Sequence, residues 1–462
     1  MPGKAPGRRI GQNMTRLLIA NRGEIACRII HAARKLGLRT VSVFSEADWE
    51  LPHVALADQS VCLGPAAARE SYLDAERLIA AAKETGCTLV HPGYGFLSEN
   101  AAFARRCEEA GLTFVGPSAD HIELMGDKQN ARDAAIAAGV PVLPGSGRLG
   151  TDEGEIAEQG RQIGYPLLVK ATAGGGGQGM QRVETAEKLL STVTRTRDFA
   201  KRVFGDGSVY LERCLTGARH VEVQVFGLGP RGALHCFERD CSLQRRHQKV
   251  IEEAPAPDLP DELRARMTEA SRNLATSLGY RGAGTVEYLF EPASGEFFFL
   301  EMNTRIQVEH PVTEAITGLD LVAAQLRLAL DPDSDPLPSQ QDISATGASI
   351  EARVYAENPE KRFLPSPGRI DALELPQVEG VTYHSGYVAG NEVTVHYDPM
   401  ILKVVASGAD REAARKRLLE ALGGMVLTGV TNNARFLSDL LENEAFVRAR
   451  FDTGTIAASK AG

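Results

Sequence analysis

The chain has 462 residues, of which 43% are hydrophobic, so it is long enough for two to four globular domains with large cores. Its formal net charge of −9 argues against a nucleic-acid-binding protein, because such proteins carry a basic surface. No apolar run reaches the roughly 18 residues of a membrane span, and the seven cysteines lack a C-x-x-C pair, which favours free thiols in the cytoplasm.

The first part of the chain predicts an open α/β layer. Residues 1–13 lack acids and a long apolar stretch, so we expect a disordered tail rather than a targeting peptide. A buried strand at Arg16–Ala20 is followed by a helix over 25–36, whose apolar residues repeat at helical spacing. The same alternation continues with a strand at 40–43, helices at 74–85 and 100–110, and short strands at 89–90 and 114–115.

The middle of the chain carries a glycine loop. A Pro/Gly-rich stretch at 140–147 marks a boundary, and the strand Leu167–Lys170 then leads into Ala173–Gly179. Backbone N–H groups in such a loop can approach phosphate oxygens closely, because glycine has no Cβ. A flexible linker is the alternative. Strands dominate beyond residue 216, with helices expected at 261–278, 320–330, 410–422 and 433–441.

Two glutamates are predicted to face each other on a β-hairpin. Strands at Gly284–Phe290 and Glu296–Asn303 flank a turn composition, and a hairpin centred near Ser294 pairs Glu287 with Glu301. Adjacent carboxylates repel each other, and a Mg²⁺ or Mn²⁺ ion between them would remove that repulsion. A register error that leaves two solvated acids is the alternative.

Two further segments carry charged groups. Arg305, Gln307 and Glu309 alternate, so an extended segment would present an oxyanion clamp, an amide and a potential base on one face. A solvent-facing polar strand is the alternative. The run Glu238–Lys249 holds three arginines, a histidine and a lysine, which in an acidic protein indicates contact with a polyanion, with a solvated face as the alternative.

These segments together resemble the biotin carboxylase family. The resemblance rests on six motifs in the family's order and runs from about Met14 to Thr455, nearly the whole chain. The motifs are Asn21–Glu24, His91–Phe96, Met125–Lys128, the glycine loop, Glu238–Lys249 and Glu301–His310.

The resemblance implies an α/β chain with an ATP-grasp fold. It implies a Rossmann-like N-terminal domain over 14–127, a mobile lid over 128–215, an ATP-grasp body over 216–345 and a C-terminal mixed-sheet domain over 346–455. For ATP it implies phosphate-binding lysines, the glycine loop, an adenine-contacting hinge and further lining residues. The phosphate-binding lysines are Lys128 and Lys170, and the loop glycines are Gly175, Gly176 and Gly177. The hinge residues are Glu212 and Leu215, and the further lining residues are His220, Gln244 and His247, with Glu287 and Glu301 also at the nucleotide.

The family's catalytic roles also map onto positions of this chain. Metal-binding positions match Glu287, Glu301 and Asn303, and bicarbonate-binding positions match Lys249, Arg305, Gln307 and Val308. The general base matches Glu309, and biotin contacts match Tyr94 and Arg353, the latter facing biotin's enolate oxygen. The implied reaction is ATP- and bicarbonate-dependent carboxylation of biotin through carboxyphosphate. Another ATP-grasp ligase that activates a different carboxylate is the main alternative, ahead of a nicotinamide oxidoreductase or an inactive homologue.

The expected partners follow from the same resemblance. The sequence has no Ala-Met-Lys-Met-like biotinylation site, so biotin is expected on a separate carrier protein or on a further domain. Residues 395–400 and 432–436 look like the acyl-CoA carboxylase branch, which implies a carboxyltransferase subunit as partner. We expect a homo-oligomer. His31 and Lys35 stand where a bacterial member that dimerises through its first helix has Arg and Glu, so that dimer is not carried over.

Overall fold

The computed structural model describes residues 15–173, 179–246 and 248–459. The tail predicted for residues 1–13 therefore lies outside the described residues. None of the described helices is long and apolar enough to cross a membrane. All seven cysteines are unpaired, as the sequence predicts.

The first unit is the predicted α/β layer. Its five parallel strands lie in the order β3-β2-β1-β4-β5, which is the Rossmann-like arrangement. The strands are β1 (Arg16–Ile19), β2 (Arg39–Ser45), β3 (Gln59–Gly64), β4 (Leu89–His91) and β5 (Thr113–Phe114). The helices are α1 (Gly23–Lys35), α2 (Pro52–Leu56), α3 (Ala75–Glu84), α4 (Ala101–Glu109) and α5 (Ala119–Gly126).

Side-chain caps explain where two of these helices begin. Asp74 accepts a hydrogen bond from the backbone N–H of Arg77 at the start of α3, and Asn100 accepts one from Phe103 at the start of α4. Each cap satisfies a backbone donor that the first helical turn leaves without a partner. The predicted helix starts at 74 and 100 are thereby confirmed.

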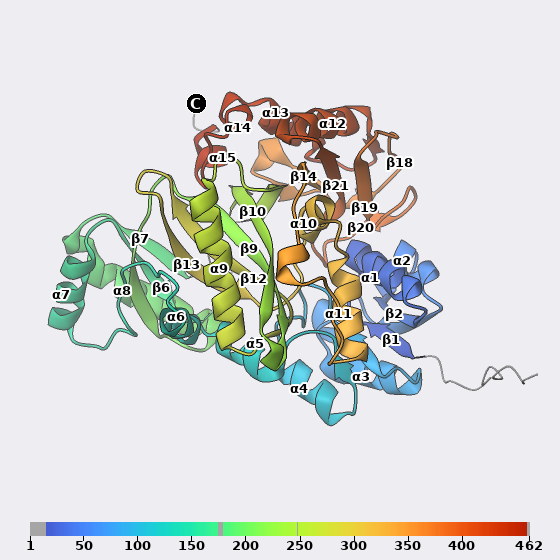
Figure 1. Cartoon of the computed structure of the whole chain (residues 1–462), viewed down its shortest axis with the longest axis horizontal. Coiled ribbons are helices and arrows are strands. Elements are labelled where there is room, and N and C mark those ends of the chain that lie inside the picture. The colour runs from blue at the N-terminus through green and yellow to red at the C-terminus, as the bar shows by residue number, and fades with distance from the viewer. Residues whose placement is uncertain (1–14, 174–178, 247, 460–462) are drawn as a thin grey trace, which may run out of the picture.

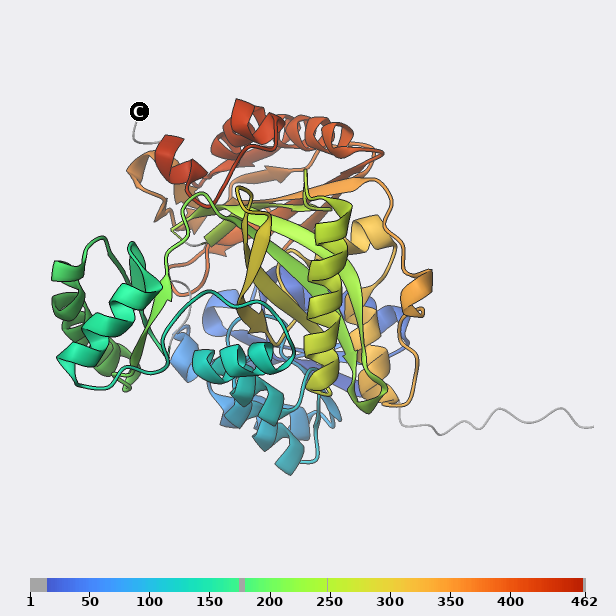
Figure 2. The ribbon, with the colours of Figure 1, turned by 60° about the vertical axis from the view of Figure 1, so that its left-hand side comes forward.

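A small unit projects from the rest of the molecule (Figure 2). It is a three-stranded antiparallel sheet in the order β7-β6-β8, covered by two helices that bury a core of its own. The elements are α7 (Glu153–Ile163), β6 (Leu167–Ala171), β7 (Met180–Val183), α8 (Leu189–Phe204) and β8 (Val209–Arg213), and α6 (Lys128–Ala137) precedes them.

An eight-stranded sheet forms the centre of the molecule (Figure 1). Its order is β13-β12-β9-β10-β11-β14-β21-β19. The strands are β9 (Arg219–Leu228), β10 (Ala233–Arg245), β11 (Gln248–Ala254), β12 (Arg281–Glu291), β13 (Glu296–Asn303), β14 (Ala348–Tyr355), β19 (Val381–Ser385) and β21 (Met400–Gly408). Helices α9 (Asp261–Ser277), α10 (His310–Thr317) and α11 (Leu321–Leu330) connect them, and α9 packs on β9 and β10.

The C-terminal part completes this sheet. Strands β14, β21 and β19 continue it past position 346, and all of its recorded strand pairs are antiparallel, whereas the resemblance implies a mixed sheet there. The reason is that β19 returns directly onto β21 through a loop rather than through a crossover helix. The helices are α12 (Arg411–Gly424), α13 (Ala434–Glu442), α14 (Glu444–Val447) and α15 (Thr455–Ser459), and the short strand pairs are β15 (Glu357–Asn358) with β16 (Leu364–Pro365), β17 (Gly368–Arg369) with β20 (Glu392–Val393), and β18 (Ala372–Glu374) with β22 (Val426–Thr428).

Candidate active site

A cavity of about 620 Å³ gathers most of the residues that the sequence singles out. Its walls come from α6, β6, the β9–β13 region, the turn after β13, and β14. The lining residues include Lys128, Lys170, His220, Gln244, Lys249, Glu287, Glu301, Asn303, Arg305, Gln307, Val308, Glu309 and Arg353. Glu212, Leu215 and Tyr94 are not among its lining residues in the described chain, and Gly175, Gly176, Gly177 and His247 lie outside the described residues.

The two hairpin glutamates face each other as predicted. The register of β12 and β13 pairs Glu287 with Glu301, and an irregularity between Glu287 and Tyr288 shifts the pairing nearer the turn by one residue. Burial raises the pKa of Glu301, and the charge of Glu287 raises it further. The pair therefore places two mutually repelling carboxyl groups in the cavity wall.

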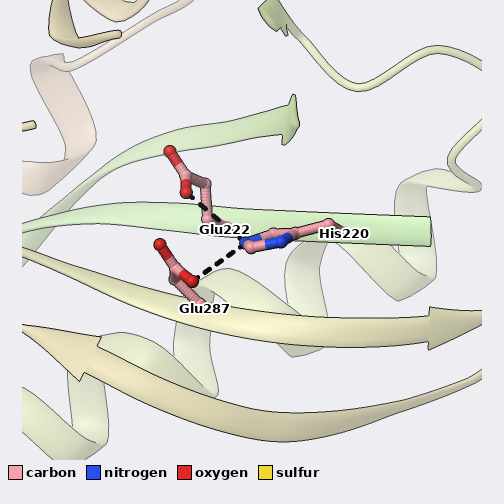
Figure 3. Close-up of side chains that lie close together, drawn as sticks. All are labelled: His220, Glu222 and Glu287. Atoms are coloured by element: carbon pink, nitrogen blue, oxygen red, sulfur yellow. Dashed lines mark ion pairs between the residues drawn. The ribbon is translucent and has the colours of Figure 1, made fainter. Parts of the chain in front are cut away.

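Glu287 is surrounded by donors. Its Oε1 accepts hydrogen bonds from the Lys249 Nζ at 3.0 Å, from the Asn303 Nδ2 at 2.9 Å and from the Gln307 Nε2 at 2.8 Å. Its Oε2 lies 3.0 Å from the Nε2 of His220 (Figure 3). Burial alone would raise the pKa of Glu287, but the charges of Lys249 and His220 hold it well below its ordinary value.

These groups fit a hard divalent cation. Two facing carboxylates and an amide oxygen are the ligand types that Mg²⁺ and Mn²⁺ prefer. Ligand atoms of His220, Glu222 and Glu287 also lie within 4.8 Å of one another (Figure 3). Asn303 turns its Oδ1 toward the Arg305 guanidinium and its Nδ2 toward Glu287, so its amide must rotate to offer oxygen to a cation at this position.

Lys249 connects the carboxylate pair to Glu309. Its Nζ lies 2.6 Å from Glu222, 2.6 Å from Glu309 and 3.0 Å from Glu287. Although burial lowers the pKa of this lysine, the surrounding acidic groups raise it well above its ordinary value. Lys249 is thus a fixed cation at the floor of the cavity.

Glu309 lies between two cations. One oxygen accepts a hydrogen bond from Lys249, and the other accepts one from the Arg353 NH2 at 2.9 Å. Burial alone would raise the pKa of Glu309, but Lys249 and Arg353 hold it well below its ordinary value. The same Arg353 NH2 lies 2.5 Å from Glu252, which belongs to β11.

The expectation that 305–309 is extended is wrong. Strand β13 ends at Asn303 and α10 begins at His310, so the residues between them form a turn. Pro311 favours the start of the helix at this point. Arg305, Gln307 and Glu309 still reach the cavity, because the turn folds over it.

The two lysines that are predicted to bind the phosphates of ATP, Lys128 and Lys170, lie near each other. Lys170 on β6 pairs with Glu212 on β8 at 2.7 Å, and Glu212 and Tyr210 raise its pKa although burial lowers it. Burial lowers the pKa of Lys128 at the start of α6, and the charge of Lys170 lowers it further. Two neighbouring cations repel each other and favour a bound polyanion. On the opposite wall, the Gln244 Nε2 lies 2.8 Å from the His220 Nδ1.

Three residues of this region, Glu99, Glu222 and Glu252, carry no role in the sequence analysis. Arg239 belongs to the run that is predicted to contact a polyanion, but it pairs with groups of the protein itself. Arg239 is fully buried and donates to five side chains, among them Glu222 and Gln307. Glu99 accepts a hydrogen bond from the Arg305 Nε at 2.9 Å, and Glu252 contacts Arg353. Strand alternation could have found Glu222, because it shares a face with His220 two residues earlier. The other contacts join distant parts of the chain, which local patterns do not reveal.

Comparison with protein-family models matches three consecutive segments of the chain. Residues 13–122 match the model "Biotin carboxylase, N-terminal domain", and residues 351–458 match "Biotin carboxylase C-terminal domain". Residues 127–335 match "Carbamoyl-phosphate synthase L chain, ATP binding domain".

Individual relatives cover nearly the same span. A biotin carboxylase of Pseudomonas aeruginosa is 48% identical over 437 residues, which cover 94% of this chain and 96% of that protein. The mitochondrial alpha subunit of methylcrotonoyl-CoA carboxylase from Dictyostelium discoideum is 47% identical and is covered to 63%. A solved biotin carboxylase complex from Campylobacter jejuni has a TM-score of 0.92 at 40% identity, covering 96% of this chain and 99% of that one. Another solved structure is the biotin carboxylase domain dimer of 2-oxoglutarate carboxylase from Hydrogenobacter thermophilus, in complex with MgADP, ADP and bicarbonate. It has a TM-score of 0.91 at 40% identity, covering 97% of this chain and 98% of that one.

Proposed function

The chain belongs to the biotin carboxylase family, and on that premise we propose that it uses ATP and bicarbonate to carboxylate biotin held on a carrier protein. The observation that carries the proposal is the continuous contact from Glu287 through Lys249 and Glu309 to Arg353. It joins a cation site, a base and an enolate-facing arginine within one cavity.

ATP binds with its phosphates near Lys128 and Lys170, whose mutual repulsion a polyphosphate relieves. Glu212 and Leu215 contact the adenine end, and His220 and Gln244 line the rest of the nucleotide site. The proposal includes ATP contacts from the glycine loop, with Gly175, Gly176 and Gly177, and from His247, all of which lie outside the described residues. The lid over 128–215 closes on this site and excludes water. Glu287, Glu301 and Asn303 would hold Mg²⁺ or Mn²⁺, which would neutralise charge on the phosphate oxygens.

Bicarbonate lies between Lys249, Arg305, Gln307 and the backbone of Val308. Glu309 removes the bicarbonate proton while a bicarbonate oxygen attacks the γ-phosphorus, which forms carboxyphosphate and releases ADP. Lys249 lies 2.6 Å from Glu309 and stabilises its anionic form before this transfer. The fixed cations then face the developing charge in a site from which water is excluded.

Carboxyphosphate breaks down to CO₂ and phosphate beside biotin. The phosphate takes the proton of the ureido nitrogen, and that nitrogen forms a bond to the CO₂ carbon. Before this bond forms, deprotonation leaves negative charge on the ureido oxygen, which Arg353 stabilises once protonated Glu309 no longer neutralises the guanidinium; after it forms, the charge lies on the new carboxylate. Tyr94 contacts biotin from the loop after β4.

The proposal includes partners. The biotin is carried by a carrier protein or domain, and a carboxyltransferase subunit receives the carboxyl group, as relatives that are subunits of acyl-CoA carboxylases support. The reaction takes place in the cytoplasm, and the chain acts as a homo-oligomer.

A steady-state assay tests the proposed function. The purified chain is given ATP, Mg²⁺ and ¹⁴C-bicarbonate with and without free biotin, and ADP and acid-labile carboxybiotin are measured. We expect biotin to stimulate ADP release and label to enter carboxybiotin. ADP release that depends on another carboxylate, without stimulation by biotin, would instead assign the chain to a different ATP-grasp ligase.

A further inference from the structure

A fully buried lysine on the C-terminal part of the central sheet reaches the catalytic turn. Lys403 lies on β21, directly opposite Arg353 of β14 in the strand register, and its side chain is 0% exposed. Its Nζ donates to the carbonyl oxygen of Val308 at 2.6 Å. Because a peptide unit is planar, this bond fixes the orientation of the peptide that joins Val308 to Glu309.

The same ammonium also reaches the biotin side of the cavity. The Lys403 Nζ lies 3.0 Å from the Oε1 of Glu24 on α1, and that oxygen accepts a hydrogen bond from the Tyr94 hydroxyl. The loop that carries Tyr94 is held in turn by Asn21, whose Nδ2 donates to the carbonyls of Pro92 and Tyr94 at 2.7 Å. One cation therefore joins the turn that carries Glu309 to the loop that carries Tyr94.

Two histidines and a glutamate also face Lys403. His384 faces it from β19, His310 from α10 and Glu351 from β14. Burial and the charge of Lys403 lower the pKa of His384 to about 3 and that of His310 well below its ordinary value. Both histidines are therefore neutral near pH 7. Burial raises the pKa of Glu351 well above its ordinary value, although the charge of Lys403 lowers it.

We propose that Lys403 is a positioning residue for carboxyl transfer, which holds the bicarbonate-binding turn and the Tyr94 loop at a fixed separation. The inference rests on the proposed function. If the two halves of the site drift apart, carboxyphosphate still forms, but its CO₂ is released away from the ureido nitrogen. Loss of Lys403 then uncouples ATP cleavage from carboxylation, since a displacement of about 1 Å between reacting groups costs on the order of 100-fold in rate.

The test compares coupling ratios. In Lys403→Met, we expect the ratio of ADP released to carboxybiotin formed to rise severalfold, and the KM for biotin to rise about tenfold while the KM for ATP stays near the wild-type value. Lys403→Arg keeps a cation and should restore part of the coupling. Glu24→Gln weakens the link from Lys403 to the Tyr94 loop and leaves the Lys403 bond to Val308, so the KM for biotin should rise without a change in the KM for bicarbonate.

A matched control separates positioning from folding. Arg411→Met breaks an ion pair between α12 and the same sheet, with buried Glu253 of β11 at 2.5 Å, and neither residue is among those that line the cavity in the described chain. We expect this variant to lose thermal stability with an unchanged coupling ratio. Should Lys403→Met fail to fold, the double variant Lys403→Met/Glu24→Gln removes both charges, so that no unpaired charge stays buried.

The outcomes separate the inference from the proposed function. A wild-type chain without biotin-dependent turnover would overturn the proposed function itself. The positioning role alone would be overturned by a different result. In that case the wild-type chain is active, and the Lys403 variants lose only stability while they keep the wild-type coupling ratio and KM for biotin.

Discussion

Replacing Glu309 by glutamine isolates the role of the base. The glutamine side chain has nearly the same volume but cannot take a proton from bicarbonate. General-base catalysis contributes roughly 10²- to 10⁴-fold, so turnover should fall by about that factor, which is roughly 2.7 to 5.4 kcal/mol of lost transition-state stabilisation. The neighbouring cations keep other partners, because Lys249 still contacts Glu222 and Glu287, and Arg353 still contacts Glu252. We therefore expect a folded protein.

The assay is biotin-dependent ADP release at saturating ATP and bicarbonate, with a nucleotide-binding measurement beside it. Binding of ATP should stay within a few-fold of the wild type, since Glu309 contacts no group that is assigned to ATP. Glu253→Gln is the matched control, a buried glutamate paired with Arg411 that is not among the cavity's lining residues in the described chain, and it should retain turnover. If Glu309→Gln keeps more than about a tenth of wild-type turnover, the assignment of the base is wrong.

Three further predictions concern the groups around this base. Arg353→Lys keeps the charge but loses the guanidinium that serves both Glu252 and Glu309, so kcat should fall at least about tenfold with little change in the KM for ATP; an unchanged kcat would contradict this. Glu301→Gln should raise the Mg²⁺ concentration needed for half-maximal rate and raise the thermal midpoint without metal, because it removes the repulsion from Glu287; a lower midpoint would argue against it. Burial lowers the pKa of His91 to about 3 in the folded chain, whereas its pKa in the unfolded chain is about 6.5. Between these two pH values only the unfolded chain binds the proton, so the folded state loses stability as the pH falls toward 3. Relative to His91→Asn, the wild type should lose about 1.4 kcal/mol of unfolding free energy per pH unit below pH 6, and a constant difference across pH would refute the argument.

The sequence predicts those parts of the site that depend on local register. A short turn composition is enough to place Glu287 opposite Glu301, because pairing in a hairpin follows from the position of its turn. The helix starts at 74 and 100 follow from single capping side chains in the same way. The alternation of Arg305, Gln307 and Glu309 is also visible, but alternation does not distinguish a strand from a turn that brings the same groups together.

Long-range pairings are the part that local patterns miss. Strand β14 joins β11 although about a hundred residues separate them, and this pairing places buried Glu252 opposite buried Glu351. Lys403 lies in an apolar strand, and its role depends on Val308 and Glu24 from two other parts of the chain. Helix α8 is absent from the predicted helices, although its buried residues Leu189, Val193 and Ala200 recur at helical spacing.

The central claim is that a bicarbonate oxygen attacks the γ-phosphorus of ATP, with Glu309 as the base. The most direct measurement uses ¹⁸O-labelled bicarbonate, ATP, Mg²⁺ and biotin, followed by mass analysis of the inorganic phosphate after few turnovers. Because the new P–O bond keeps the bicarbonate oxygen when carboxyphosphate breaks down, the account predicts one ¹⁸O atom in each phosphate formed. Phosphate that carries only solvent oxygen would show that water attacks ATP directly, and would contradict the account.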